Sequence, residues 1–545
     1  MSLEKRVLVL ATETDHIDRT VSVLRAQRWL DVEHREGVIV AQDNELRLRF
    51  DVCSTVGDAL RRLDRQAYSA ILVDTRQLCD SMAKLERMDQ ALWTLLDAIA
   101  SHPDREKRYP HHRLVVVVGG ANSGRVDGQL FRLGQRHVGA FVRDASFRRG
   151  LTDEEVHHRQ ASWAHDLWQT LSRIVVRRRA GRRAISCSGG GITGVFYELG
   201  VLKCLNDAMG TTDIRDFDMY FGISAGAIVT SLIANGMPVE EAMERLGGLR
   251  DPSERLRISL AEVNWRGMLG RLPIAASNLG QYVRRVREGQ EVPSLSGLAI
   301  ELTSLMGPLF TAEEHGDELR EMLSRPGMTN DFRKLKRKLY IGATDQDRRV
   351  PVLFGDEGWD DVAIHKAVQA SSAIHPFFDA VEIKGRFYTD GVVTRTSNLR
   401  AAVAKGVDLL FIVDPFLPLI SEEAGFNRRQ STLFLIEQDL KTISYTRFEG
   451  VSDEILRRMP EVACYTFVPS NRMRWWMARN PMSARNFDII VTQAYQSTYR
   501  RLVNLEVKLA ADLAAHGITL DLAPVRERVE RLERERRPSA RTLLA

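Results

Sequence analysis

The sequence has few cysteines and no long apolar run, and each shortage excludes a class of protein. The five cysteines lie far apart among 545 residues and form no C-x-x-C pair, which argues against a disulfide framework and a structural zinc site. No segment reaches the roughly 18 apolar residues of a membrane span, and the N-terminus lacks the apolar core of a signal peptide. We therefore expect a cytoplasmic protein whose only membrane contact would be peripheral.

An excess of charge of one sign is also missing. The 77 Lys and Arg residues against 72 Asp and Glu residues leave a formal net charge of +5, too balanced to indicate nucleic-acid binding. A hydrophobic content of 44% is enough for sizeable cores, and the length suggests several domains of about 100–200 residues each. We expect a multidomain protein with no nucleic-acid partner, no metal and no cofactor, and a homo-oligomer is left open.

Residues 1–150 alternate short β-branched apolar runs with helical patterns, which indicates a flavodoxin-type α/β domain with a parallel sheet. The second and third of the expected strands could instead form a hairpin. The expected strands are Arg6–Ala11, Val38–Ala41, Leu48–Cys53, Ala70–Asp74, Leu114–Gly119 and Gly139–Arg143.

This first domain also resembles a response-regulator receiver domain, because Asp74 ends an apolar strand where that family has its phospho-accepting aspartate. The resemblance is partial. Glu13 stands alone where receivers have an acidic pair for Mg²⁺, and Arg143 stands where they have a lysine. Asp74 is a candidate regulatory phosphoacceptor; the alternatives are a degenerate regulatory or dimerising domain, or an aspartate that caps a turn.

Three further segments complete the organisation. Residues 151–183 are expected to form an exposed helical linker with an apolar stripe from Trp163 to Ile174. The arginines at its end would interact either with the negative end of the helix dipole or with anionic lipid. Residues 184–420 form a second α/β domain, interrupted at 252–325 by a cap-like helical insertion. Residues 421–545 are expected to be a helical extension, in which Trp475 and Trp476 would either pack on the second α/β domain or contact a membrane.

A G-x-S-x-G motif at Gly222, Ser224 and Gly226 follows a short apolar strand and precedes a helical pattern. In that context the motif predicts a nucleophile elbow, a tight turn that lifts the serine hydroxyl above the sheet. The two glycines leave room for the neighbouring backbone. The positive end of the following helix would favour negative charge developing at the serine.

A second glycine-rich turn, Gly189-Gly190-Gly191, lies about 30 residues earlier and also joins a strand to a helix. Its backbone N–H groups could hold an oxyanion or a phosphate. The spacing through Gly194 also fits a dinucleotide-binding fingerprint, which would make the protein a nicotinamide-dependent enzyme. That alternative is weakened because Asp216 and Asp218 precede or open the next strand, whereas a ribose-binding acid should end it.

A nucleophilic serine needs a base, and histidine is poorly placed for that task. The histidines after Ser224 follow no convincing strand. Asp390 is better placed, because it closes a short strand-like segment before a glycine that allows a sharp turn.

In this order, the Gly189–Gly194 loop, the elbow around Ser224 and the pair Asp390-Gly391 resemble the patatin-like phospholipase family over residues 184–415. The resemblance implies the FabD/lysophospholipase-like three-layer α/β sandwich. It also implies a Ser224–Asp390 dyad without histidine, with an oxyanion hole at Gly189, Gly190 and Gly191. One departure is Thr193, where the family usually has a lysine or arginine.

The expected function is therefore a serine acyl hydrolase that cleaves acyl esters of lipids or phospholipids through an acyl-enzyme, regulated by the N-terminal domain. Two other classes remain open: a catalytically weak signalling scaffold and a nicotinamide-dependent enzyme. Labelling of Ser224 by a fluorophosphonate separates the hydrolase from the scaffold.

Overall fold

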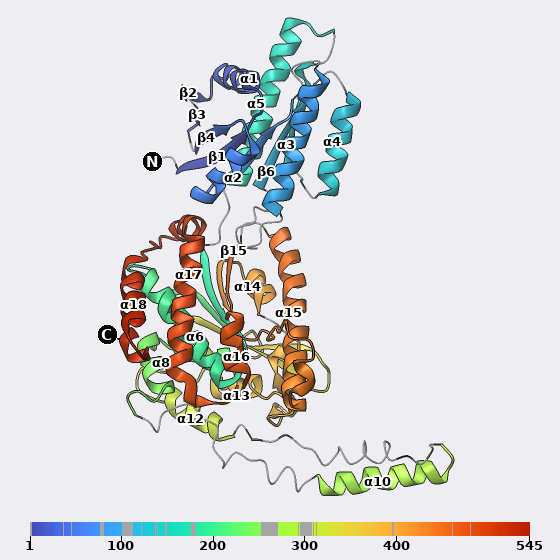
Figure 1. The fold of residues 1–545 in the computed structure, drawn as a ribbon, viewed down its shortest axis with the longest axis vertical. Coiled ribbons are helices and arrows are strands. Elements are labelled where there is room, and N and C mark those ends of the chain that lie inside the picture. Colours follow the sequence, from blue (N-terminus) through green and yellow to red (C-terminus); the bar gives the residue numbers. More distant parts are fainter. Residues whose placement is uncertain are drawn as a thin grey trace. The chain divides into compact units, whose positions relative to one another are not determined.

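A computed structural model describes residues 3–544 except 36, 45, 77–80, 101–112, 121–122, 137, 139, 148–149, 176–180, 252–270, 291, 293, 295–307, 309, 312, 395–396, 460–461 and 480. The chain divides into two compact units (Figure 1). The N-terminal unit contains residues 1–179 with the short segments 456–461 and 505–515. The second unit contains the remainder; we call it the catalytic unit because the predicted nucleophile elbow and Asp390 belong to it.

The N-terminal unit is built on a seven-stranded sheet in the order β2-β3-β4-β1-β5-β6-β7. Its five parallel strands have the order β4-β1-β5-β6-β7, which is the order of flavodoxin-like sheets. Two antiparallel strands, β2 and β3, extend one edge, so the expected hairpin is present as β3-β4 and continues into a further strand. The strands are β1 Leu3–Leu10, β2 Asp31–Arg35, β3 Val38–Gln42, β4 Leu46–Cys53, β5 Ala70–Asp74, β6 Leu114–Gly119 and β7 Ala140–Asp144.

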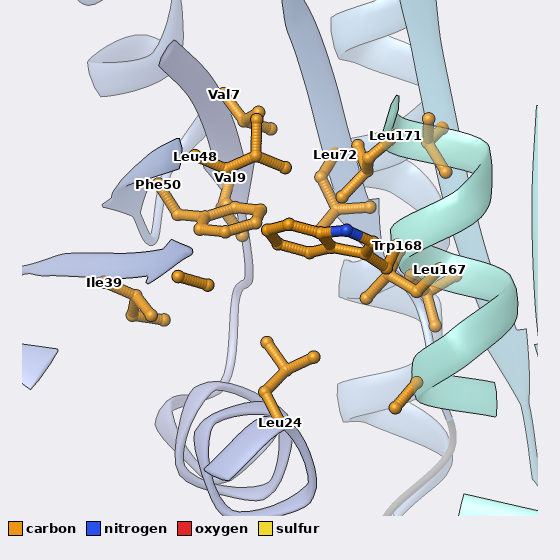
Figure 2. Close-up of a cluster of buried hydrophobic side chains, with 14 of the residues drawn as sticks. Val7, Val9, Leu24, Ile39, Leu48, Phe50, Leu72, Leu167, Trp168 and Leu171 are labelled. Carbon is orange, nitrogen blue, oxygen red and sulfur yellow. The ribbon is translucent and has the colours of Figure 1, made fainter. Parts of the chain in front are cut away.

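The helix predicted as an exposed linker belongs to the core of the N-terminal unit. Helix α5 (Asp153–Val175) buries its apolar stripe in one cluster with strand residues such as Val7 and Leu72, and Figure 2 shows Trp168 facing Phe50. Two indoles and several leucines on one helix face bury too much apolar surface to remain in water, which is why the linker prediction was wrong here. The arginine run that follows lies mostly outside the described residues. The other helices of this unit are α1 Thr14–Arg25, α2 Val56–Arg65, α3 Met82–Ala100 and α4 Ser123–Gln135.

The catalytic unit contains an eight-stranded mixed sheet in the order β12-β13-β10-β9-β8-β14-β15, with β11 paired to β10. Strands β10, β9, β8, β14 and β15 are parallel, and β11, β12 and β13 run antiparallel to their neighbours. The strands are β8 Arg182–Cys187, β9 Met219–Gly222, β10 Lys338–Asp345, β11 Pro351–Phe354, β12 Val381–Ile383, β13 Arg386–Asp390, β14 Val407–Val413 and β15 Ala463–Phe467.

Helices cover this sheet and connect its strands. Leu410 and Ile412 of β14 pack in one cluster with Leu399 of α14 and Phe448 of α15, so these helices cover one face of the sheet. Helix α6 is buried on nearly all sides and packs against α17, where a side chain at Gly200 would collide with the backbone of Val491. The helices are α6 Gly191–Ala208, α7 Ala225–Ala234, α8 Val239–Leu246, α10 Leu272–Arg287, α12 Glu313–Leu323, α13 Ile364–Ser371, α14 Leu399–Ala404, α15 Thr432–Arg458, α16 Asn471–Arg479, α17 Phe487–Ala514 and α18 Ala523–Arg534.

Residues 421–545 are not only helical, because β15 pairs in parallel with β14 and completes the catalytic sheet. The short apolar run of β15 is bounded by helices on both sides, so a pattern dominated by helical periods concealed it. The cap-like insertion at 252–325 falls largely outside the described residues; within it, α10 and α12 are described.

Candidate active site

Ser224 occupies a strained turn between β9 and α7. Its backbone angles are φ 52° and ψ −123°, in a region that residues with a side chain rarely adopt. The side chain is 9% exposed, and the residue immediately precedes the first turn of α7. The turn therefore presents the hydroxyl at the positive end of a helix, as the G-x-S-x-G pattern predicts.

The two glycines of the motif are required by close packing on both sides of this turn. A Cβ at Gly222 would collide with Thr230, and a Cβ at Gly226 would collide with the Cys187 carbonyl. The Gly226 N–H donates to the Ser188 carbonyl at 3.0 Å, which ties the start of α7 to the end of β8. The strain at Ser224 is thus held in place by contacts that leave no room for a side chain.

Ser371, at the end of α13, holds the elbow from a third direction, and sequence reasoning did not identify it. The Ser224 N–H donates to the Ser371 hydroxyl at 2.9 Å, and that hydroxyl donates to the Gly342 carbonyl of β10 at 2.6 Å. Ser371 is fully buried, so the two hydrogen bonds join elbow and sheet in a dry environment. Nothing in the sequence near Ser371 signals this role, because its partners are 147 and 29 residues away.

The glycine loop faces Ser224. A Cβ at Gly189 would lie 3.3 Å from the Ser224 Cβ, so the two backbones approach closely. Gly190 (φ 157°) and Gly191 (φ 63°) adopt conformations that favour glycine, and α6 begins at Gly191. Among the described residues, the N–H groups of Gly189, Gly190 and Gly191 have no hydrogen-bond acceptor. They are therefore available to an anion beside the serine.

Asp390 lies at the end of β13, and one of its two carboxylate oxygens accepts a hydrogen bond. Its Oδ1 accepts the Val392 N–H at 2.9 Å, whereas its Oδ2 is buried without a hydrogen bond of normal geometry to any described residue. Burial raises the pKa of Asp390 to about 7; the Val392 N–H and the nearby Ser224 hydroxyl act in the opposite direction by favouring the carboxylate. The Ser224 hydroxyl thus lies close to the Asp390 carboxylate. Because burial raises the pKa of Asp390, its carboxylate is a stronger base than an exposed aspartate.

A cavity of about 140 Å³ brings these groups together. Ser224, Asp390 and the three loop glycines line it, with predominantly apolar side chains around them, including Leu319 and Met322 of α12. Gly222 and Gly226 lie behind the elbow and do not line it. His365 and His375 also reach the cavity wall; burial lowers the pKa of His365, and its ring meets Asn330 at 2.7 Å.

The C-terminal part of the chain supplies a wall of the same cavity. Phe416, Ile436, Glu437, Leu440, Pro481 and Met482 all line it. The Pro481 carbonyl accepts the Thr193 N–H at 3.0 Å, and a Cβ at Gly191 would lie 2.9 Å from that carbonyl oxygen. Pro481 therefore covers the first turn of α6 at the position where Thr193 departs from the family pattern. No sequence signal indicated this contact, because it joins segments nearly 290 residues apart.

The acidic residues that a dinucleotide site would need are at the wrong end of the strand. Asp218 precedes β9 and accepts the Arg183 N–H at 2.8 Å. Asp216 lies in the short turn before it, while the end of β9 leads to Ser224. This placement favours a reacting serine over a ribose-binding acid at the end of the strand.

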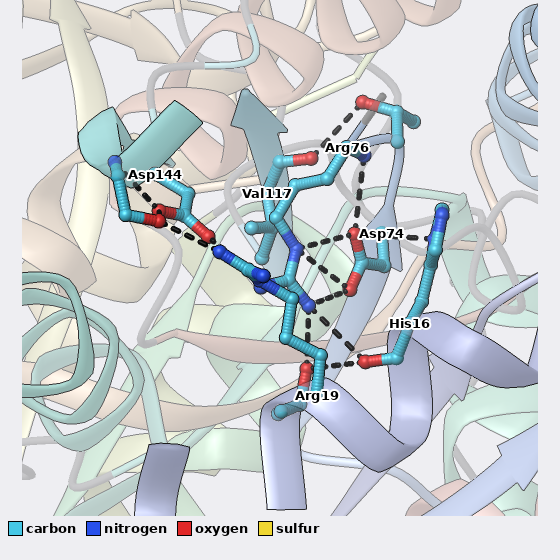
Figure 3. Close-up of polar contacts among 9 residues, drawn as sticks. His16, Arg19, Asp74, Arg76, Val117 and Asp144 are labelled. Atoms are coloured by element: carbon cyan, nitrogen blue, oxygen red, sulfur yellow. Dashed lines mark hydrogen bonds and ion pairs between the residues drawn. The ribbon is translucent and has the colours of Figure 1, made fainter. Parts of the chain in front are cut away.

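Asp74 belongs to the N-terminal unit and is not among the residues that line this cavity. It ends β5 as predicted, but both of its carboxylate oxygens bond to Arg76, with Nη2 to Oδ2 at 2.6 Å and Nε to Oδ1 at 3.0 Å (Figure 3). Arg76 is fully buried and also donates to Asp144 Oδ2 at 3.1 Å, while its guanidinium stacks 4.6 Å from the centre of the Trp163 ring. The carboxylate is thus engaged in an internal ion-pair network.

The described part of the chain contains no cluster of three or more His, Cys, Asp or Glu side chains suited to a metal ion. None of its described helices is long and apolar enough to cross a membrane.

A strained serine between a parallel strand and a helix, facing a glycine loop at the start of another helix, defines the catalytic unit as an α/β fold of the serine-hydrolase type. Residues 185–403 match the family model described as patatin-like phospholipase, so this part of the chain is similar to that family.

Individual relatives overlap with limited parts of the chain. The cUMP-AMP-activated phospholipase of Escherichia coli is 44% identical over 59 residues, which is 11% of this chain and 18% of that protein. Among solved structures, VipD from Legionella pneumophila aligns over 59% of this chain and 67% of its own, with 14% identity and a TM-score of 0.28. The type III effector ExoU aligns over 65% and 63%, with 15% identity and a TM-score of 0.26. Because these TM-scores are too low to support an argument, we describe the architecture of the catalytic unit from the order of its strands alone.

Proposed function

We propose that this protein is a serine acyl hydrolase that cleaves acyl esters of lipids, with Ser224 as nucleophile and Asp390 as its base. The observation that carries the proposal is the meeting of a strained serine and a buried, incompletely bonded carboxylate in one apolar cavity. An apolar wall suits a long acyl chain, and the polar groups converge at one point where an ester would react.

In the first half of the reaction, Ser224 Oγ attacks the ester carbonyl carbon while its proton passes to Asp390. The carbonyl oxygen becomes an oxyanion, which the N–H groups of Gly189, Gly190 and Gly191 would stabilise by roughly 3–4 kcal/mol for each well-placed donor. The tetrahedral intermediate then collapses. The carbon–oxygen bond to the alcohol breaks, Asp390 returns the proton to the departing oxygen, and an acyl-enzyme remains.

In the second half, Asp390 takes a proton from water, whose oxygen attacks the acyl-enzyme carbonyl. Collapse of the second intermediate releases the fatty acid and restores the Ser224 hydroxyl. A pKa raised to about 7 suits both halves, because the carboxyl must accept and return a proton near neutral pH.

The test of this function is covalent labelling with a fluorophosphonate, followed by mass spectrometry of fatty acids released from mixed lipids. We expect one label per chain that disappears in Ser224→Ala, together with loss of fatty-acid release. Ser372→Ala is a matched control, because Ser372 also lines the cavity but does not lie on the elbow. Absence of labelling in the wild-type protein would contradict the proposal and favour the scaffold.

The N-terminal unit is proposed as a regulatory domain that resembles a receiver in strand order and in the placement of Asp74. The ion pair between Asp74 and Arg76 argues against phosphorylation of Asp74, because a phosphoryl group would have to bond to one of the carboxylate oxygens that accept hydrogen bonds from the guanidinium. We therefore favour recognition of a partner over phosphorylation as its regulatory input. We propose that the protein acts in the cytoplasm, in peripheral contact with the membranes that hold its substrate.

A further inference from the structure

Arg447, in helix α15, is a half-buried cation that bonds to backbone carbonyls and to no acidic side chain among the described residues. Its Nη1 donates to the Val393 carbonyl at 3.1 Å, and its Nη2 donates to the Val392 carbonyl at 3.0 Å. Burial lowers the pKa of Arg447, and no described carboxylate opposes that effect. Withdrawing a charge from water without a counter-charge is costly, so this contact is an expensive way to hold two carbonyls.

The two carbonyls belong to the turn that follows the proposed base. Asp390 caps the short 3₁₀ turn Gly391–Val393, and its Oδ1 accepts the Val392 N–H at 2.9 Å. Arg447 and Asp390 therefore bond to the same residue, Val392, the guanidinium at its carbonyl and the carboxylate at its N–H. The position of the carboxylate thus depends on a turn that Arg447 holds.

The other described anchors act on the backbone of Asp390 itself. The Thr344 hydroxyl of β10 donates to the Asp390 carbonyl at 3.0 Å, and the Asp390 N–H donates to the Ala373 carbonyl at 3.0 Å. These bonds fix where the strand ends. They do not fix the following turn, whose N–H orients the carboxylate, and that turn is the part bonded by Arg447.

Helix α15 also reaches the serine side of the site. Leu440 lies seven residues before the arginine, which is about two helical turns and therefore the same face of α15. Leu440 packs in one apolar cluster with Ile223 and Val392. Ile223 immediately precedes the nucleophilic serine, and Val392 lies in the turn after the aspartate. One helix thus contacts the segments that carry both proposed reacting groups.

Small displacements of the carboxylate are expected to matter. Proton transfer requires the two oxygens to lie within about 2.6–3.2 Å, and a misplacement of about 1 Å can cost about 100-fold in rate. The Val392 N–H also lowers the pKa of Asp390 against the effect of burial. The other titratable side chains that line the cavity are Glu318, His365, His375 and Glu437, and none of them is a cause of the shift in the pKa of Asp390.

We propose that Arg447 is a positioning residue for the hydrolase reaction, which holds the Gly391–Val393 turn so that Asp390 faces Ser224. The inference rests on the proposed hydrolase function. It adds a residue that lies beyond the segment matched by the family model, in the part of the chain that follows residue 403.

The test uses the full-length chain and p-nitrophenyl butyrate, an ester that needs no lipid surface. We expect Arg447→Met to lower kcat by about 10–100-fold and to leave KM within about twofold, because Arg447 does not line the cavity. The acid limb of the kcat/KM profile should move to higher pH by about 0.5–1 unit, because the Val392 N–H that lowers the pKa of Asp390 is no longer well placed. Arg447→Lys should recover part of kcat, because its ammonium can still donate to the turn.

Arg474→Met is the matched control. Arg474, in α16, is also half-buried and donates to two backbone carbonyls, those of Pro469 at 2.9 Å and Pro418 at 3.1 Å. Burial lowers the pKa of this arginine as well. Arg474→Met should lower the urea midpoint of unfolding about as much as Arg447→Met, yet it should leave kcat within about twofold and the acid limb in place. Equal losses of kcat in the two variants would overturn the proposal.

The remaining outcomes also decide between positioning and a merely structural role. An unchanged kcat in Arg447→Met overturns the proposal, and so does a loss of kcat without movement of the acid limb. If Arg447→Met does not fold, Arg447→Gln replaces it; the same shift of the acid limb supports positioning, and an unchanged profile overturns it.

Failure of the hydrolase function itself is recognised separately. In that case the wild-type protein hydrolyses no ester and takes up no fluorophosphonate. The pKa of Asp390 is then measured by carbon-13 NMR of labelled aspartate, with Asp390→Asn to assign the signal. A higher pKa in Arg447→Met than in the wild type supports the role of Arg447 in holding the carboxylate, and an equal pKa overturns it.

Discussion

The two units each bury an aspartate at the end of a strand, and they treat it in opposite ways. In the N-terminal unit, Asp74 meets a buried guanidinium that engages both of its oxygens. In the catalytic unit, Asp390 has one backbone partner and one oxygen without a normal hydrogen bond among the described residues. A paired carboxylate contributes to structure, whereas an unpaired one remains ready to accept a proton. A position at the end of a strand therefore does not distinguish the aspartate proposed as a base from the paired one, whereas the groups around each carboxylate do.

The largest expected effect comes from neutralising the unpaired carboxylate. Asp390→Asn should lower kcat for ester hydrolysis by about 10²–10⁴-fold, because the amide cannot accept the serine proton. Asp74→Asn is the matched control in the N-terminal unit and should leave kcat within about twofold, since Asp74 takes no part in the chemistry. Comparable losses in both variants would remove the contrast between the two aspartates.

Breaking the ion-pair network should mainly affect stability. Arg76→Ala should lower the free energy of unfolding of the N-terminal unit by about 3–5 kcal/mol, because it leaves the buried Asp74 without its guanidinium partner and leaves Asp144 with the looser pair to Arg19 at 3.7 Å. Urea unfolding followed by circular dichroism measures this. Arg61→Ala, which removes an exposed pair with Asp58 in the same unit, should cost no more than about 1 kcal/mol. Adding Asp74→Asn and Asp144→Asn to Arg76→Ala should restore part of the loss, and failure to do so would show that the charges are not its cause.

The pH dependence sharpens the comparison further. Since burial raises the pKa of Asp390 to about 7, kcat/KM should fall as the pH drops below about 7, where the carboxyl is protonated and cannot act as a base. The contribution of Asp390 to the free energy of unfolding changes with pH in the opposite direction to the activity. Because the pKa of Asp390 is raised in the folded state, its contribution to stability is fully present below about pH 4 and is lost as the pH rises through about 7.

A second buried carboxyl provides the control for this profile. Burial also raises the pKa of Asp414 to about 7, and its Oδ1 accepts the Phe416 N–H at 3.0 Å. Asp414→Asn should alter the pH dependence of stability while the midpoint of the kcat/KM profile stays in place. If that midpoint moves instead, Asp414 and not Asp390 governs the activity profile.

The smallest expected effect concerns phosphorylation. Incubation with acetyl phosphate and Mg²⁺ should produce no phosphoryl mass increase on the wild-type chain, because Arg76 holds both Asp74 oxygens and no acidic cluster for a metal is found among the described residues. Intact-protein mass spectrometry measures the adduct. Stoichiometric phosphorylation that Asp74→Asn abolishes would restore Asp74 as a phosphoacceptor.

How far the sequence could predict this arrangement depends on how local each feature is. The elbow is predictable because its strand, serine and two glycines are contiguous. Asp390 is a candidate base from its own segment, because it closes a short strand before a glycine, but its pairing with Ser224, 166 residues away, follows only from the family resemblance. The contacts of Ser371 and Pro481 arise only when distant elements meet, so no periodicity or motif indicated them.

The N-terminal unit shows the same limit. Asp74 and Arg76 are nearly adjacent in the sequence, yet their link to Asp144 depends on the order of strands in the sheet. The apolar stripe of α5 was visible in the sequence, but its partner surface was not, and an amphipathic helix without a known partner was assigned to a linker.

The position of Pro481 over the start of α6 has a practical corollary for protein engineering. The segment recognised by its family pattern stops at residue 403, yet β15 and the residues around 416, 437 and 481 close the sheet and enclose the reacting groups. A fragment cut at that border would lose two strands of the sheet, β14 and β15, and would expose the Gly189–Gly191 loop to water. Transfer of the proposed activity to another scaffold would therefore have to include the strands and helices after residue 403, because the segment that matches the family model is shorter than the segment that encloses the cavity.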